Sequence, residues 1–143
     1  MKKPGVVLLI FIVCVAGSAW GQISWTPSVS GTTAALNGIA YGNGTFVAVS
    51  SNTNIILTSP DGVTWTSRSP GGTGTYALYG VAYGSGIFVA VGADYFMAPY
   101  SGTVATSSDG IAWTHSDPSP MLFFYGVTYA NGTFVAVGVA GTV

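Results

Sequence analysis

Few residues of this chain could perform acid–base or metal chemistry. From residue 22 onward the ionisable side chains, tyrosines aside, are one arginine, one histidine and four aspartates, and the chain has no glutamate. Hydrolysis of a glycosidic bond needs two carboxyl groups roughly 5–10 Å apart. Asp61 and Asp109 each precede a glycine in a turn-like sequence, where a carboxylate caps backbone N–H groups. Only Asp94 and Asp117 remain, both expected in loops, so the sequence predicts no catalytic pair.

The other candidate is His115, two residues before Asp117. One imidazole and one carboxylate fall short of the three or four ligands of a zinc site. No Gly-x-Ser-x-Gly motif supplies a nucleophile. The one cysteine, Cys14, lies in an N-terminal apolar segment, which excludes disulfides and cysteine metal sites from the rest of the chain. We therefore expect His115 to be a solvated loop residue, and the protein to use no cofactor and no metal.

The N-terminus has the pattern of a secretory signal peptide. Lys2 and Lys3 precede an apolar run from Val6 to Ala16, and Ala19-Trp20-Gly21 gives a small-x-small cleavage signal. The alternative is an uncleaved anchor, but a spanning helix needs roughly 20 apolar residues without the small polar breaks present here. We expect residues 1–21 to be removed and residues 22–143 to be secreted, to the periplasm or cell surface. The short leader is typical of bacteria.

The charge balance excludes one class of partner. With the leader removed, Arg68 is the only fixed cation against four aspartates. Such a surface cannot neutralise phosphates, which argues against nucleic acid as a partner. Anionic membranes are disfavoured for the same reason, so we expect no membrane association after leader cleavage.

One phrase occurs three times, at Leu36–Ser50, Leu78–Gly92 and Phe124–Gly138. Repetition of this fidelity indicates a repeat architecture. The centre of each copy is Asn-Gly or Ser-Gly between β-prone runs, a strong signal for a tight hairpin. The run after each turn, such as Phe46–Val49, is apolar at every position, and a strand of this kind must be covered on both faces. Each copy therefore predicts a hairpin within stacked sheets.

A second phrase lies between the copies, at Ser59–Thr66 and Ser108–Thr114. Short strands before and after it would bring each unit to four antiparallel strands. Four such strands, covered above and below by neighbouring sheets, describe a β-propeller blade. The spacing of 42 residues from Leu36 to Leu78, and of 46 from there to Phe124, agrees with blade repeats.

The second phrase resembles the Asp box of the BNR repeat family, known from sialidase-like and photosystem-assembly-factor-like secreted propellers. The family pattern is Ser-x-Asp-x-Gly-x-x-Trp, and this chain matches it with one residue fewer between Asp and Gly, at Ser59, Asp61, Gly62 and Trp65 and at Ser107, Asp109, Gly110 and Trp113. The resemblance implies a hairpin between the third and fourth strands at the outer edge of a blade. The residue types add that each Asp caps a turn, that each Gly takes a positive φ, and that each Trp packs between sheets.

The number of units is unusual. We expect three, around residues 23–64, 65–112 and 113–143, with the last incomplete, whereas closed propellers typically have four to eight blades. Residues 23–26 could supply the missing fourth strand. The remaining explanations are a fragment of a longer chain, assembly of several copies, or a β-trefoil, which also has three repeats.

The resemblance to sialidases does not extend to their activity. Those enzymes use three arginines and a tyrosine activated by glutamate, and this chain has neither set. We therefore predict a non-enzymatic, secreted scaffold that binds a protein or a glycan, or serves as a structural module. Tyr95, Phe96 and Tyr100 gather in one segment and suit stacking on a ligand, although they could equally cover a core edge. The alternative is a fragment of a sialidase-like or other glycan-active enzyme with its catalytic residues elsewhere.

Overall fold

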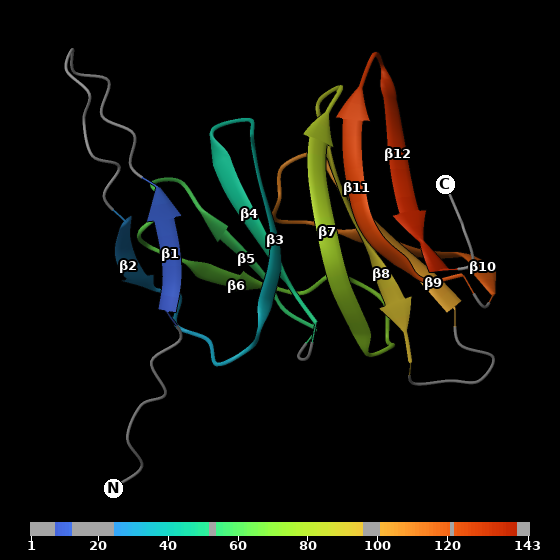
Figure 1. The fold of residues 1–143 in the computed structure, drawn as a ribbon, viewed down its shortest axis with the longest axis horizontal. Helices are drawn as coiled ribbons and strands as arrows, with labels where there is room; N and C mark the ends of the chain where they lie inside the picture. Colours follow the sequence, from blue (N-terminus) through green and yellow to red (C-terminus); the bar gives the residue numbers. More distant parts are fainter. Residues whose placement is uncertain (1–7, 13–24, 52–53, 96–100, 121, 140–143) are drawn as a thin grey trace, which may run out of the picture.

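The computed structural model describes residues 8–12, 25–51, 54–95, 101–120 and 122–139, all of them in strands, turns or short connections (Figure 1). Within these ranges no helix is long and apolar enough to cross a membrane. The strands are β1 (Leu8–Ile12), β2 (Trp25–Val29), β3 (Leu36–Gly42), β4 (Thr45–Ser50), β5 (Ile56–Ser59), β6 (Thr66–Arg68), β7 (Tyr76–Gly84), β8 (Ile87–Asp94), β9 (Ser101–Ser107), β10 (Thr114–Pro120), β11 (Phe124–Ala130) and β12 (Thr133–Gly138).

The strands form blade-like antiparallel sheets in chain order. The first sheet is β3-β4-β5-β6, the second is β7-β8-β9-β10, and the third consists of the hairpin β11-β12. The all-β, propeller-like arrangement of three repeats predicted from the sequence is confirmed, with two complete four-stranded sheets. The β-trefoil alternative is not adopted, because each repeat closes its own sheet.

The phase of the repeat differs from the sequence-based division. Each fourth strand, β6 or β10, pairs with the third strand before it, so the sheets span residues 36–68 and 76–120 and not units divided at 64/65 and 112/113. The connections between sheets therefore follow the hairpins that contain Asp61 and Asp109. Their tryptophans stay with the sheet that precedes them.

The N-terminal strand does not complete the third sheet. Residues 25–29 form β2, which pairs with β1 on the opposite side of the first sheet from β11 and β12 (Figure 1). Residues 23 and 24 lie outside the described range. Strand β1 falls within the predicted leader, and cleavage of residues 1–21 stays a prediction.

The three hairpins have nearly identical turns. Both central residues have positive φ in each: 47° and 73° at Asn43-Gly44, 47° and 81° at Ser85-Gly86, and 51° and 81° at Asn131-Gly132. These are the values of the type I′ turns whose twist matches that of the strands. Each hairpin also has a one-residue bulge at the same place, after Leu36, Leu78 or Phe124.

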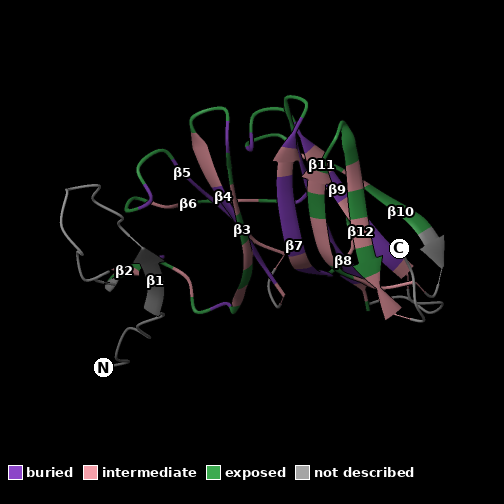
Figure 2. Ribbon diagram, turned by 45° about the horizontal axis from the view of Figure 1, so that its top comes forward, coloured by how far each residue is buried: buried purple, intermediate pink, exposed green. Residues whose placement is uncertain are grey.

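The core lies between the sheets. Innermost strands β3, β7 and β11 run side by side (Figure 1), and β7 contacts both of the others. Val47, Val49 and Ile56 of the first sheet pack with Leu78, Val81, Phe88, Ala90 and Ala105 of the second. Burial is therefore concentrated in the second sheet, which is covered on both faces, and falls off in β12, where exposed positions alternate with half-buried ones (Figure 2).

Candidate functional site

Four aromatic side chains meet where the second sheet adjoins the start of the third. Tyr95 directly follows β8, Tyr79 lies in the bulge of β7, and Phe123 and Tyr125 flank the first residue of β11. The Tyr95 and Tyr79 hydroxyl oxygens are 3.2 Å apart. Ring centroids are 5.2 Å apart for Tyr95 and Phe123, and 5.6 Å apart for Tyr79 and Tyr125 in an edge-to-face arrangement. We call these four residues the aromatic surface.

The bulges explain why the rings reach solvent. An extra residue in one strand of an antiparallel pair re-aims its side chain. In the second and third hairpins the bulged residues are Tyr79 and Tyr125, whereas in the first it is Asn37, whose Nδ2 donates to the Leu78 carbonyl oxygen at 3.0 Å. Tyr125 is 52% exposed and Tyr95 is 44% exposed. The repeat thus presents aromatic rings at one junction and an amide at the other.

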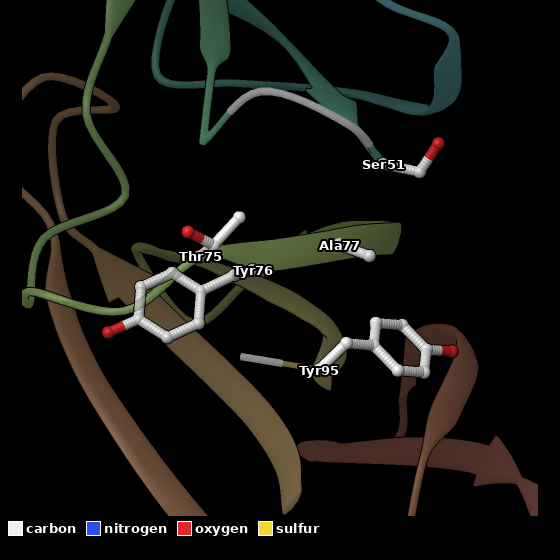
Figure 3. A pocket seen from close by; sticks show the side chains of 5 residues that line it. All are labelled: Ser51, Thr75, Tyr76, Ala77 and Tyr95. Carbon is white, nitrogen blue, oxygen red and sulfur yellow. The ribbon is translucent and has the colours of Figure 1, made fainter. Parts of the chain in front are cut away.

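A shallow pocket adjoins the aromatic surface. Its volume is about 120 Å³, and it is lined by Ser51, Thr75, Tyr76, Ala77 and Tyr95 (Figure 3). None of these side chains carries a charge at neutral pH. Pockets that enclose a small molecule usually measure roughly 300–1,000 Å³. This one can take a few hydroxyl groups or waters, so any larger ligand would have to lie across the surface.

The wall of the pocket is fixed by hydrogen bonds from the first sheet. The Tyr76 backbone N–H donates to Asn54 Oδ1 at 2.7 Å. The Nδ2 atom of Asn54 donates to the Gly74 carbonyl oxygen. The buried Tyr76 hydroxyl accepts from the Gly74 N–H at 2.9 Å. Tyr76 is therefore a rigid part of the wall, while Tyr95 forms the accessible rim.

The environment of Tyr95 keeps its phenol neutral. Partial burial, followed by the hydrogen bond with Tyr79, raises the pKa of Tyr95 to about 12. An oxygen with this pKa is neither a useful general base nor a nucleophile near pH 7. Tyr95 can offer a ring face and a hydrogen-bonding hydroxyl.

The sequence-based site residues are only partly placed. Tyr95 lies in the aromatic surface, whereas Phe96 and Tyr100 fall outside the described residues. Sequence analysis missed Tyr79, Phe123 and Tyr125. A signal for two of them was present, because the repeated phrase changes at the bulge position from Asn to Tyr.

The residues of the two segments that resemble Asp boxes form turns with matching hydrogen bonds. Asp61 Oδ1 accepts from the backbone N–H groups of Val63 at 2.8 Å and Thr64 at 2.7 Å, and from Ser59 Oγ at 2.9 Å. In the second turn Asp109 Oδ1 accepts from Ile111, Ala112 and Ser107 at 2.8, 2.9 and 3.0 Å. The φ angles of Gly62 and Gly110 are 73° and 76°.

These hydrogen bonds hold both carboxyl groups in the charged form. Backbone N–H groups of Thr64 and Val63, and then the Ser59 hydroxyl, lower the pKa of Asp61 to about 2. Donation from Ala112, Ile111 and Ser107 lowers the pKa of Asp109 in the same way. A carboxyl group tuned in this direction is a poor general acid at neutral pH. The geometry is that of a turn cap.

The second box also joins two sheets. Trp113 Nε1 donates to the Gly110 carbonyl oxygen at 2.9 Å, and its ring lies 6.3 Å from that of Phe88 at the edge of the core. A Cβ atom at Gly110 would lie 3.2 Å from a methyl carbon of Val47 in the first sheet. Trp65, the equivalent residue of the first box, is partly buried.

A hollow of about 360 Å³ lies beside this second box. Its lining is Ile87, Thr106, Ser107, Ser108, Ala112 and Thr114. The set contains no aromatic ring and no charged group. It therefore offers less to a ligand than the aromatic surface does.

His115 is not the solvated loop residue that the sequence suggested. It lies on β10 with its side chain 10% exposed, and its ring stacks on Tyr76 at a centroid distance of 3.9 Å. The prediction failed because neighbours from other strands enclose the ring. Asp117 also lies within β10, and Asp94 ends β8, so neither occupies the predicted loop.

The hydrogen bonds of His115 do not form a catalytic triad. Thr103 Oγ1 donates to Asp117 Oδ1 at 2.9 Å and lies 2.7 Å from His115 Nε2. Because the threonine proton is used on the carboxylate, Nε2–H must be the donor to Oγ1. Thr103 is fully buried and cannot reach a substrate. Among the described residues, no group of three or more His, Cys, Asp or Glu side chains could hold a metal ion.

No family model and no curated protein matches this sequence. Among solved structures, the chain is similar to a Bombyx mori GH32 beta-fructofuranosidase, a mutant in complex with sucrose, at 15% identity and a TM-score of 0.49. The similarity covers 73% of this chain and 29% of that one, so the chain spans less than a third of the enzyme's length. At this level of similarity nothing follows about ligand or activity.

Proposed function

We propose that this protein is a secreted, non-enzymatic binding module whose aromatic surface takes an uncharged glycan. The observation that carries the proposal is the grouping of Tyr79, Tyr95, Phe123 and Tyr125 beside an uncharged pocket. One side of a sugar ring presents C–H groups that pack on an aromatic face, while its hydroxyls need nearby hydrogen-bonding groups. Rings and hydroxyls are both present here.

The surroundings favour a neutral ligand. The residues that line the pocket carry no charge, and the two Asp-box carboxylates are committed to their own turns. A ligand with phosphate, sulfate or carboxylate groups would find no cation among the lining residues to offset its desolvation. An uncharged polysaccharide face avoids that cost.

The same residues support a role without catalysis. Asp61 and Asp109 serve as turn caps, and Asp117 accepts the hydroxyl proton of the buried Thr103. On this proposal the hairpins that resemble Asp boxes are scaffold, and the chain is a relative of that repeat family. If it is part of a longer glycan-active enzyme, the same surface would position substrate for residues elsewhere.

The test is retention of the full chain in native gels cast with neutral polysaccharides. Tyr95→Ala and Tyr125→Ala should each weaken binding by about tenfold, corresponding to the loss of about 1.4 kcal/mol of ring contact. Tyr41→Ala is the matched control, because Tyr41 is 57% exposed and lies on the first sheet. Melting temperatures should stay within a few degrees of wild type.

Two results would count against the proposal. One is a panel in which no neutral polysaccharide retards the wild-type chain, while a protein ligand binds in a Tyr95-dependent way. The other is retention that survives both substitutions. A large fall in melting temperature for Tyr95→Ala would instead identify the ring as part of the core edge.

A further inference from the structure

Each internal sheet junction uses the same contact between a tyrosine and a glycine. The ring of Tyr83 in β7 lies directly over Gly42 in β3, so closely that a Cβ atom at Gly42 would overlap the ring. Tyr129 of β11 covers Gly84 of β7 in the same way. At both junctions a glycine is needed because no side chain fits beneath the tyrosine.

The rest of each junction follows the same plan. Side chains alternate across a strand, so each innermost strand has a tyrosine face toward the preceding sheet and a small-residue face toward the next. A Cβ atom at Gly38 would lie 3.1 Å from the Tyr79 carbonyl oxygen, and one at Gly80 would lie 3.0 Å from Gly126 Cα. Close approach of the backbones therefore requires small residues all along this face.

Among the described residues, no strand covers the tyrosine face of the first sheet in this way. Tyr41 is 57% exposed and Ile39 is 51% exposed, whereas Val81, the residue equivalent to Ile39 in the second sheet, is 7% exposed. Tyr41 packs on Phe46 of its own sheet at a centroid distance of 4.5 Å, as Tyr83 packs on Phe88 at 4.6 Å. The first sheet thus has the same tyrosine–phenylalanine packing on this face as the second. We call Ile39 and Tyr41 the open tyrosine face.

The small-residue face of the third sheet has larger side chains than those of the first two sheets. Thr128 stands where the first two sheets have alanine, and Ala130 stands where they have Gly42 and Gly84. Both side chains are exposed. Ala130 therefore places a methyl group where the two internal junctions hold a tyrosine ring.

We propose that the open tyrosine face docks a further sheet of this repeat that carries glycine at the hairpin position, and that Ala130 excludes the third sheet of a second copy from that place. The two internal junctions supply the model for the contact. The side chains named on both faces are uncharged, so steric fit decides which sheet binds. A head-to-tail contact between copies would join them into a ring or, where the rotation does not close, into a filament, and the alanine prevents both.

The test converts the third sheet into an acceptor. Ala130→Gly, alone and together with Thr128→Ala, is compared with wild type by sedimentation velocity of the full chain over a wide concentration range. The glycine variants should associate head to tail at concentrations at least tenfold lower than wild type. Adding Tyr41→Ala to the glycine variants should abolish their increased association. Ala130→Ser should associate no more than wild type.

A second measurement covers the case in which the glycine variants fold poorly. Gly84→Ala adds the same methyl group at an internal junction, and it should lower the melting temperature by several degrees because the Tyr129 ring must move. An unchanged melting temperature would overturn the proposal, since a methyl group would then be no barrier. So would wild-type association that Tyr41→Ala dissolves, or well-folded Ala130→Gly chains that do not associate.

Discussion

The two turns that resemble Asp boxes and the aromatic surface show two different uses of one repeat. Corresponding hydrogen-bond distances in the two boxes agree within 0.2 Å, down to the serine that accepts from the glycine N–H at 2.8 Å in each. At the bulge the repeat instead changes from Asn37 to Tyr79 and Tyr125. The serine, aspartate and glycine that set the backbone are the same in both box turns, whereas the outward-facing bulge residue differs between units.

The largest effect is expected from the tryptophan of the second box. Trp113→Ala removes a ring that packs on the core and a hydrogen bond to Gly110, so unfolding free energy in urea should fall by about 3 kcal/mol. Ile111→Ala, at a side chain 53% exposed in the same turn, should change it by less than about 0.5 kcal/mol. Equal effects would mean that the box does not tie the sheets together.

A smaller loss is expected from the serine beneath the turn. Ser107→Ala leaves the buried N–H of Gly110 without its acceptor, at a cost of about 1–3 kcal/mol. Ser108→Ala changes the exposed neighbour and serves as the control. The urea midpoints of the two variants are compared. Similar midpoints would mean that the Ser107 hydrogen bonds do not stabilise the turn.

The box carboxylates should give the fold a defined acid sensitivity. The pKa of Asp61 is about 2 in the folded chain, against 3.8 for a free side chain, so its stabilisation is complete above pH 4 and is lost as the pH falls toward 2. Asp61→Asn should flatten the dependence of melting temperature on pH across that window. A profile identical to wild type would show that the turn does not depend on the charge.

The smallest effect is expected at the aromatic surface. Tyr95→Phe removes an exposed hydroxyl contact with Tyr79 and keeps the ring, so the unfolding free energy should change by less than about 0.5 kcal/mol. Thermal melts measure the change. A loss as large as that of Ser107→Ala would mean that this region, too, serves the scaffold.

Local patterns predicted most of the fold because they act over a few residues. Asn43-Gly44 and its equivalents specify a tight turn by their own φ preferences, and the apolar run of β4 requires two covered faces. The boundaries of the units were less accessible, because a repeat can be divided at any position and only the strand pairing shows that β6 and β10 belong to the sheets before them.

The candidate site was harder to predict because it is assembled from distant segments. Tyr95 and Phe123 are 28 positions apart and meet only when the third sheet stacks on the second. His115 was misplaced for the same reason, since Tyr76 and Thr103 enclose it from other strands. The residue types indicated the chemistry of which these side chains are capable. Their accessibility to a ligand depends on neighbours that are distant in the sequence.

The stacked order of the sheets also bears on how the molecule comes apart. Each sheet touches mainly the one beside it, so cooperativity passes along the stack between nearest neighbours. In β12 the side chains of Val135 and Val137 are exposed, whereas β8 is buried along almost its whole length. We therefore expect the amide protons of the third hairpin to exchange with solvent through partial opening. Those of β8 should exchange only on global unfolding.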